Sequence, residues 1–231
     1  MTKLTKPIKF KKLAIFSDIH FGRRANSKVH NQDCLDFITW FCSLFRAAGD
    51  YTHVCFLGDW FESRAAINIE TMDYSYAGLR MLDELGLPVY FCVGNHDLHR
   101  RTTRDVHSVR MFNELKNFTV VDSVIVVDGL LFAPFLFEHE YAELLKHLDC
   151  WAFLGHFEFK GFVVTGHSHT LDHGPDHKLF KDPKKIFSGH FHKRQISDNV
   201  IYGGSPFGMD FGDAGDSERG MTTYEVLEDK V

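Results

Sequence analysis

Carboxylate, amide and imidazole side chains recur in this chain at the ends of short apolar runs. Five places share this pattern, and each opens a polar loop: Asp18-Ile19-His20, Gly58-Asp59, Gly94-Asn95-His96-Asp97, Gly155-His156 and Gly189-His190-Phe191-His192. These groups are ligands for manganese, iron or zinc, and the lack of a thiolate among them argues against a structural zinc site. The set is typical of a two-metal centre that hydrolyses phosphate esters.

Seven of these residues are candidate metal ligands: Asp18, His20, Asp59, Asn95, His156, His190 and His192. Side chains two residues apart at a strand end, such as Asp18 and His20, can project to the same side. Asp59 stands alone after Gly58, where one carboxylate can bridge two ions. Two divalent ions about 3.5–4 Å apart lower the pKa of a water between them and hold the attacking and leaving oxygens at phosphorus.

His96 and Asp97 are the candidate catalytic residues. His96 follows a candidate ligand but need not be one, so we expect it to protonate the leaving oxygen or to stabilise the transition state. Asp97 is expected to orient His96 from behind, as carboxylates that support histidines do.

A rival motif, Gly166-His167-Ser168-His169, has the same spacing as Gly189 to His192. It begins soon after Gly155-His156, whereas a helical crossover between parallel strands needs at least about 10–12 residues. We therefore favour His190 and His192 as ligands and keep His167 as the alternative.

The elements that position these motifs can be read from the apolar pattern. Buried strands are expected at 13–17, 54–57, 89–93, 151–154 and 185–188. Helices are expected near 35–45, 72–85, 106–116 and 140–148. Further strands are expected at 124–127 and 130–133, joined as a hairpin by Asp128-Gly129, and at 199–202 and 221–226. The alternation of strand and helix in the first half predicts a parallel sheet with the motifs at its carboxyl edge.

Composition limits the class of protein. The 231 residues are 44% hydrophobic and 25% charged, which predicts one folded domain over 1–231. Five cysteines without a CxxC pair indicate buried, reduced thiols. No apolar run reaches the ~20 residues of a membrane helix, and the run after the basic N-terminus is too short for a signal peptide, so we expect a cytoplasmic protein.

The net charge of −5 argues against a uniformly basic nucleic-acid coat, although it permits a local basic face. Basic residues directly follow two of the metal motifs and could hold DNA phosphates, with a solvated loop as the alternative interpretation. These candidate DNA contacts are Arg23, Arg24, His99, Arg100 and Arg101.

The ordered motifs resemble those of the calcineurin-like metallophosphoesterase superfamily across nearly the whole chain. Within it the chain is similar to SbcD-type DNA repair nuclease subunits, particularly those of phage recombination systems. That similarity is carried by Gly94 to His99, Gly155 to Glu158 with Gly161-Phe162, Ser188 to His192, and Gly204-Ser205-Pro206.

The resemblance implies a four-layer α/β/β/α sandwich and two divalent metal ions, Mn²⁺ in preference to Mg²⁺. It implies 3′-to-5′ exonuclease activity on duplex DNA and endonuclease activity on single strands, an SbcC-type ABC ATPase partner, and a homodimer. Carried over by position, one ion would be held by Asp18, His20, Asp59 and His192. The other would be held by Asp59, Asn95, His156 and His190, with His96 as the catalytic histidine.

The chain departs from the family pattern in two places. Many relatives carry a second catalytic histidine three residues after the bridging aspartate, where this chain has Glu62. The family also usually continues into a DNA-capping region and an ATPase-docking tail, which we expect to be absent here. Two alternatives follow: a phosphoesterase for small phosphodiesters or phosphoproteins, or a weakly catalytic scaffold for DNA ends.

Overall fold

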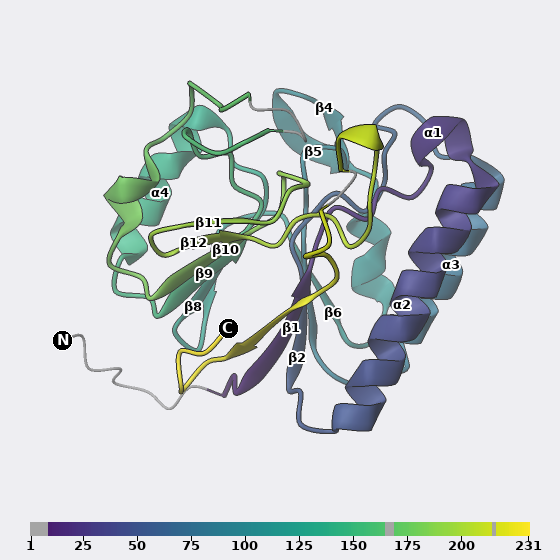
Figure 1. The fold of residues 1–231 in the computed structure, drawn as a ribbon, viewed down its shortest axis with the longest axis horizontal. Helices are drawn as coiled ribbons and strands as arrows, with labels where there is room; N and C mark the ends of the chain where they lie inside the picture. The colour runs from purple at the N-terminus through teal and green to yellow at the C-terminus, as the bar shows by residue number, and fades with distance from the viewer. Residues whose placement is uncertain (1–8, 165–168, 214–215) are drawn as a thin grey trace.

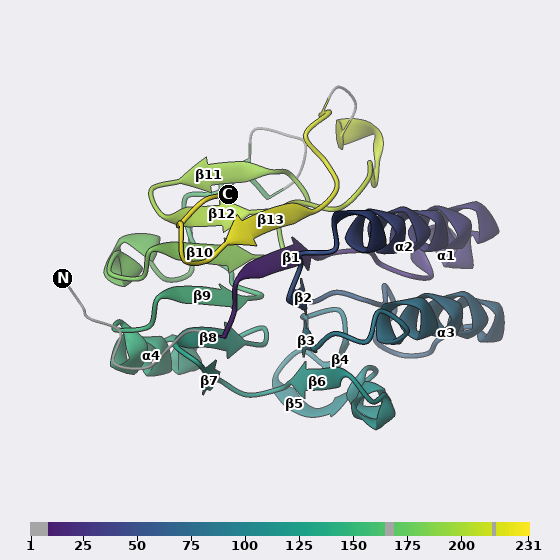
Figure 2. The same ribbon diagram turned by 90° about the horizontal axis from the view of Figure 1, so that it is seen from below.

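The computed structural model describes residues 9–164, 169–213 and 216–231. Two β-sheets stack face to face, and helices cover both outer faces (Figures 1 and 2). The first sheet has the order β13 (Thr222–Glu225), β1 (Lys12–Phe16), β2 (His53–Phe56), β3 (Val89–Cys92) and β6 (Phe118–Val121). The second has the order β11 (Gln195–Ser197), β12 (Val200–Tyr202), β10 (Lys185–Ser188), β9 (Ala152–Gly155), β8 (Leu130–Ala133) and β7 (Ile125–Val127). The expected four-layer α/β/β/α sandwich is confirmed.

The helices divide between the two outer faces. Helices α1 (Arg23–Asn26), α2 (Lys28–Ala48) and α3 (Ile69–Asp83) lie beside the first sheet, and α4 (Tyr141–Leu144) lies beside the second (Figure 2). Short 3₁₀ helices complete the chain: η1 (Arg110–Glu114), η2 (Glu138–Glu140), η3 (Leu145–His147), η4 (His177–Phe180) and η5 (Phe211–Asp213).

Alternation along the strands builds three layers of core. Leu13 and Ile15 of β1 face the second sheet, where they join Phe132 and Leu154 in one buried cluster. Ala14 and Phe16, which point the other way, pack with residues of α2 and α3. Because successive side chains of a strand point to opposite faces, each central strand contributes to two cores and is apolar throughout.

The helix ends follow from local chemistry. Helix α2 begins after Ser27, whose hydroxyl accepts from the His30 amide, and ends at Gly49, which adopts a left-handed conformation with φ 66°. Helix α3 begins after Asn68, whose side chain accepts from the amides of Glu70 and Thr71. These caps satisfy backbone groups that have no partner within the helix.

The expected helix over 106–116 is wrong. Residues Thr103–His107 form β5, which pairs with β4 (Leu98–Arg100) in a two-stranded sheet, and only Arg110–Glu114 form a 3₁₀ turn. The apolar residues Val109 and Phe112 are buried by that single turn, so their spacing resembled that of a longer helix. The expected helix over 140–148 is also shorter, with α4 flanked by 3₁₀ turns.

The other expected strands are present, each within a residue or two of its expected bounds. The hairpin of β7 and β8 turns at Asp128 and Gly129, whose φ angles of 45° and 84° suit the turn that Asp-Gly favours. Strands β1, β2, β3 and β6 run parallel, and so do β8, β9, β10 and β12. The loops that follow β1, β2, β3, β9 and β10 therefore meet at one edge of the sandwich.

Candidate metal centre

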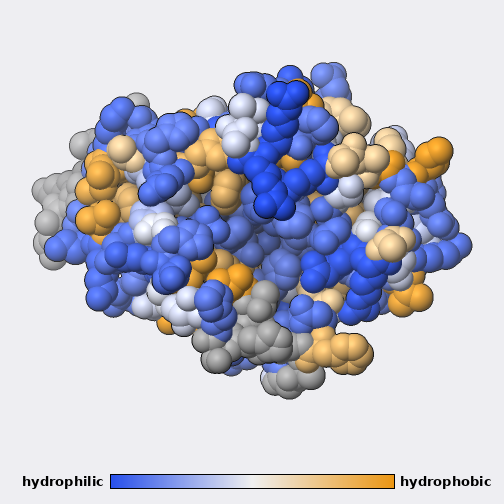
Figure 3. Space-filling model, turned by 90° about the horizontal axis from the view of Figure 1, so that it is seen from above, coloured by the Kyte–Doolittle hydropathy of each residue, from blue (hydrophilic) through white to orange (hydrophobic). Residues whose placement is uncertain are grey.

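The five motifs converge at the carboxyl edge of both sheets. Figure 3 looks onto this edge, and the middle of the face is recessed and lined by hydrophilic residues. Asp18, His20, Asp59 and His156 are each at most 1% exposed, whereas Asn95, His96, His190 and His192 are half-buried. The centre thus has a buried floor and a rim open to solvent.

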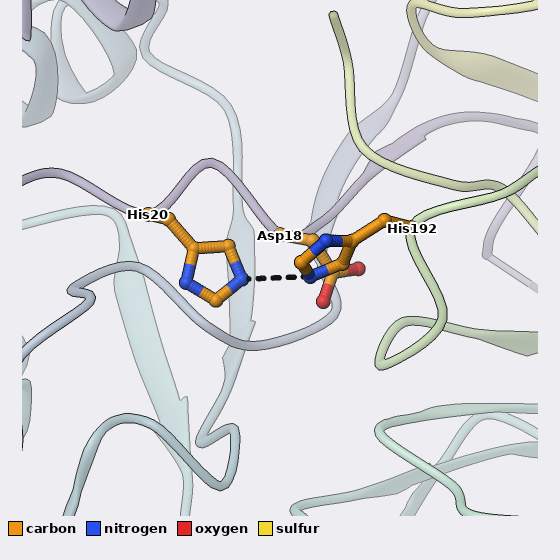
Figure 4. Close-up of side chains that lie close together, drawn as sticks. All are labelled: Asp18, His20 and His192. Carbon is orange, nitrogen blue, oxygen red and sulfur yellow. Dashed lines mark hydrogen bonds between the residues drawn. The ribbon is translucent and has the colours of Figure 1, made fainter. Parts of the chain in front are cut away.

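One half of the centre is formed by Asp18, His20 and His192 (Figure 4). Nε2 of His20 lies 3.1 Å from Nε2 of His192, and ligand atoms of all three residues lie within 4.8 Å of one another. Two imidazole nitrogens and a carboxylate that point to one place are a donor set for a divalent ion.

The other half is formed by Asn95, His156 and His190. Oδ1 of Asn95 lies 2.9 Å from Nε2 of His156 and 2.9 Å from Nδ1 of His190, and those two nitrogens are 3.3 Å apart. An amide oxygen and two ring nitrogens therefore converge on a second point.

Asp59 lies between the two halves. Its Oδ2 atom is 3.6 Å from Nε2 of His20 in the first half and 3.5 Å from Nε2 of His156 in the second. One carboxylate oxygen thus faces both donor sets, which is the position that a ligand shared by two ions requires.

The backbone at the centre adopts conformations that most residues avoid. Asp18, His20, Asp59 and His190 all have positive φ, at 54°, 53°, 62° and 92°. Such conformations cost of order 1–3 kcal/mol each and persist where the surroundings impose them. Here the loops bond to one another: the amides of Asp18 and His20 donate to the carbonyls of Gly58 and Asp59.

Glycine is required where the loops touch. A Cβ on Gly94 would overlap the amide nitrogen and the carboxylate of Asp59, and one on Gly58 would overlap the His156 ring. Glycine at these positions allows the loops to approach closely, and this close approach brings Asp59 between the two halves of the centre.

The charges of the centre are strongly coupled. Burial raises the pKa of Asp59, but the neighbouring His156 outweighs burial and lowers that pKa well below the usual value. Burial likewise opposes the charge of His156, but Asp59 raises its pKa to about 9. Burial and the nearby His20 lower the pKa of His192. The carboxylates thus attract positive charge to the point where the donor atoms converge.

His96 is held beside the centre by its backbone and by its ring. Its amide donates to Oδ1 of Asp59 at 2.8 Å, and its Nδ1 lies 2.9 Å from the carbonyl oxygen of Glu62. Because a carbonyl only accepts, Nδ1 carries a proton, and Nε2 is the ring nitrogen left for a substrate.

Asp97 does not support the His96 ring, which differs from the expectation. Its carboxylate instead accepts four backbone amides, those of Asp59, Trp60, Phe61 and Gly94. These amides belong to two strand-end loops and are buried, so the carboxylate is satisfied there. Burial and the charge of Asp59 raise the pKa of Asp97 to about 7, although the amides oppose this.

Two of the expected DNA contacts are engaged within the protein. Arg23 lies 3.4 Å from Glu62 and 3.9 Å from Asp210, and Arg24 donates to the carbonyl of Met209. His99, Arg100 and Arg101 are exposed at β4 and the turn that follows it. Within the described ranges the guanidinium groups of Arg100 and Arg101 form no ion pair.

Arg64 was missed in the sequence. It is half-buried, and Asp59 and Asp97 both act on its charge. Burial lowers its pKa, and across the part of the chain that the structure describes its guanidinium has no ion-pair partner. The sequence signal that could have identified Arg64 is its position five residues after the candidate ligand Asp59.

Arg219 belongs to a stretch, Gly212 to Gly220, that fits the family resemblance but was given no role, and it fixes the loop that carries His192. Its guanidinium donates to the carbonyl of His192 at 3.0 Å and to the Ser205 hydroxyl, and it pairs with Asp213 at 2.8 Å. Charge-assisted bonds of this kind order a loop that has little regular structure.

Of the rival motif, Gly166, His167 and Ser168 lie outside the described residues. His169 is exposed. His190 and His192 follow β10, which is the parallel neighbour of β9 and is reached by a long connection, as the spacing predicted.

Comparisons with known proteins agree with this arrangement. A family model described as calcineurin-like phosphoesterase matches residues 11–194. Exonuclease subunit 1 of Enterobacteria phage T4 is 29% identical over 228 residues, which cover 95% of this chain. The chain spans 66% of the length of that phage protein, just under two thirds.

Two solved structures resemble this chain, and the first of them supports the fold. A purple acid phosphatase from yellow lupin seeds matches 83% of this chain and 40% of its own, at 14% identity and a TM-score of 0.55. A nuclease of Pseudomonas putida matches 82% of this chain and 66% of its own, at 16% identity and a TM-score of 0.41. Across the described residues no helix is both long and apolar enough to cross a membrane.

Proposed function

Since the chain belongs to the calcineurin-like phosphoesterase family, we propose that its metal-dependent hydrolysis acts on the phosphodiester bonds of DNA. The observation that carries this proposal is the convergence of two donor sets on Asp59. Arg100 and Arg101, which form no ion pair among the described residues, are exposed a few positions after the Gly94 to Asp97 motif. The relation to a phage exonuclease subunit supports DNA as the substrate.

The donor atoms fit two divalent ions. The first would be held by Asp18, His20, Asp59 and His192, and the second by Asp59, Asn95, His156 and His190. Four imidazole nitrogens favour Mn²⁺ over Mg²⁺, which prefers oxygen ligands and keeps several waters. When bound, such a pair of ions supplies Lewis-acid stabilisation of the phosphoryl group and a water of lowered pKa.

The side chains around the ions would perform the remaining steps. His96 would act through Nε2: when that nitrogen is also protonated, it would give its proton to the departing 3′ oxygen, while the Nδ1–H group stays bonded to the Glu62 carbonyl. Arg64, Arg100 and Arg101 would hold neighbouring phosphates of the strand. The buried carboxylates of Asp18 and Asp59 would keep the floor of the centre negative and attractive to cations.

We further propose 3′-to-5′ exonuclease activity on duplexes, endonuclease activity on single strands, and work as the nuclease subunit of an ATPase complex in DNA end processing. These features rest on the resemblance to SbcD-type subunits. A homodimer is proposed on the same ground.

One assay tests the substrate class. A 3′-labelled duplex, a single-stranded circle and a small aryl phosphodiester are each offered with Mn²⁺ or Mg²⁺. We expect release of label from the duplex and opening of the circle, both faster with Mn²⁺. Cleavage of the small ester alone would contradict the nuclease proposal and would favour a phosphodiesterase for small substrates. DNA binding without any cleavage would favour the scaffold.

Metal content separates the two G-H-x-H motifs. We expect His190→Ala to lose one bound Mn²⁺ and His167→Ala to keep both. The opposite result would transfer the ligand role to the motif at Gly166.

A further inference from the structure

Two glutamates contact ligand histidines of the centre: Glu62 contacts His20 in the first half, and Glu158 contacts His190 in the second. Oε2 of Glu62 lies 2.8 Å from Nδ1 of His20, and Oε1 of Glu158 lies 3.2 Å from Nε2 of His190. Both carboxylates are about one third exposed, at 31% and 32%, while the histidine side chains are 1% and 15% exposed. Neither glutamate belongs to the expected ligand set.

In each histidine, the nitrogen near the glutamate is the one that faces away from the donor atoms. His20 turns Nε2 toward His192 and Asp59, and its Nδ1 toward Glu62. His190 turns Nδ1 toward Asn95 and His156, and its Nε2 toward Glu158. Each half thus pairs a glutamate with the outer nitrogen of a ligand histidine, and this outer nitrogen is Nδ1 in His20 and Nε2 in His190.

We propose that Glu62 and Glu158 are positioning residues of the metal centre, each holding the outer ring nitrogen of one ligand histidine so that the inner nitrogen is free to bind an ion. This inference rests on the proposed two-ion centre. A neutral imidazole carries one proton, and an acceptor on one side fixes that proton there. The inner nitrogen then presents its lone pair, and the carboxylate raises its basicity.

The contact at His20 matters because that ring is fully enclosed. Nδ1 of His20 is buried, and no hydrogen bond of regular geometry reaches it from any described residue. Oε2 of Glu62, at 2.8 Å, is close enough to accept its proton. Arg23 also meets this carboxylate, but at the longer distance of 3.4 Å.

Glu62, at the position where the resemblance implies a histidine in many relatives, also contacts its surroundings through its backbone. The Glu62 backbone is fixed by its amide, which donates to the Phe21 carbonyl, and its own carbonyl holds His96. A side-chain substitution leaves both contacts in place. Glu62 therefore connects a ligand histidine through its carboxylate with the candidate catalytic histidine through its backbone.

The test measures Mn²⁺ binding by calorimetry and by electron paramagnetic resonance, which distinguishes a coupled pair of ions from a single ion. We expect Glu62→Ala and Glu158→Ala each to lower the affinity for one of the two ions by about 10–100-fold. Each variant should then show the spectrum of a single ion at Mn²⁺ concentrations that fill both sites of the unmodified chain. Glu143→Ala is the control, because that carboxylate meets a histidine outside the centre, His147, at 3.5 Å.

Double variants assign each glutamate to its half. At the same Mn²⁺ concentrations, Glu62→Ala with His192→Ala, in the same half, should still bind one ion, whereas Glu62→Ala with Asn95→Ala should leave both sites largely empty. Glu62→Gln and Glu158→Gln should recover most of the affinity, because an amide oxygen still accepts the ring N–H. If glutamine variants are as weak as alanine variants, the carboxylates act through charge alone and positioning is wrong.

Unchanged affinity for both ions in the two alanine variants would also overturn the proposal. Failure of the unmodified chain to bind two Mn²⁺ would instead overturn the metal centre itself, and with it the proposed function. Circular dichroism checks folding. Where an alanine variant does not fold, Glu62→Met or Glu158→Met takes its place, since methionine keeps the volume and lacks the acceptor.

Discussion

Asp97 joins two loops of the metal centre through a single buried carboxylate. It is 1% exposed and accepts four amides from the segments that carry Asp59 and Gly94. A buried donor left without an acceptor costs about 1–3 kcal/mol. We expect Asp97→Ala to lower the free energy of unfolding by about 3–5 kcal/mol, measured by urea denaturation with and without Mn²⁺.

Asp97→Asn is the graded comparison for that variant. Asparagine keeps one acceptor oxygen, so its loss of stability should fall between those of alanine and the unmodified chain. A loss below about 0.5 kcal/mol for Asp97→Ala would show that water replaces the carboxylate and that the amide bonds carry little net stability.

His96 is the residue for which binding and turnover should separate. We expect His96→Ala to bind two Mn²⁺ as tightly as the unmodified chain, because none of the proposed ligands is removed. Turnover on the labelled duplex should fall by about 10²–10⁴-fold, as proton transfer to the leaving oxygen is lost. Metal titration and single-turnover rates measure the two effects.

His147→Ala serves as the control for this variant, since His147 lies on η3 and contacts Glu143. It should leave both readouts unchanged. An unaltered cleavage rate in His96→Ala would remove His96 from the mechanism, whereas loss of an ion would make it a ligand.

At the scale of elements, the strand ends were predictable because two signals coincide there. An apolar run buried on both faces marks a central parallel strand, and glycine followed by a polar residue marks its end. Strands β2, β3, β9 and β10 follow this rule, whereas β1 ends at Ser17-Asp18 without a glycine. The β4–β5 pair has neither signal: β5 is mostly polar and Val106 is 59% exposed, so its pairing depends on tertiary contacts.

The residues of the candidate site also separate into those that the sequence could identify and those that it could not. Seven possible ligands could be chosen by residue type, because each lies directly after a strand. Glu158 and Arg219 were not assigned a role, because their partners are distant in sequence. The Glu158–His190 contact spans 32 positions and the Arg219–His192 contact spans 27. Such pairs become visible only when the strand order is known.

His53, the first residue of β2, makes the stability of the first sheet depend on pH. Its ring lies 4.2 Å from that of Phe10, and burial lowers its pKa to about 4, although Asp128 opposes this. In the unfolded chain the pKa is about 6.5. Between these values the unfolded chain binds the proton and the folded chain does not, so stability is present above about pH 6.5 and is lost as pH falls toward 4.

The variant His53→Phe removes this titration and keeps a ring against Phe10. We expect its unfolding free energy to fall by about 1–2 kcal/mol less than that of the unmodified chain between pH 7 and pH 4, allowing for solvent screening of the partly exposed ring. Urea denaturation at several pH values measures the difference. Parallel pH profiles for the two proteins would show that His53 is protonated in the folded chain.

At the scale of the whole molecule, one outer face carries a group of exposed apolar side chains. Ile69, Met72 and Tyr76 lie on one side of α3 at helical spacing, with exposed fractions of 84%, 45% and 56%. Met111 on η1 is 62% exposed and lines, together with Met72 and Tyr76, a groove of about 320 Å³. Exposed apolar patches of this kind mark contact sites, and the proposed homodimer would need one.

A two-fold dimer places the same patch on both subunits, so one substitution changes the interface twice. We expect Met111→Glu to convert a dimer of twice 26.6 kDa into a monomer, because two buried carboxylates would lack partners. Sedimentation equilibrium measures the mass. Val126→Glu is the matched control, since Val126 is 45% exposed on β7 in the other sheet, and it should leave the dimer intact. A monomeric unmodified chain would refute the dimer, whereas a dimer that survives Met111→Glu would assign its contact to another face.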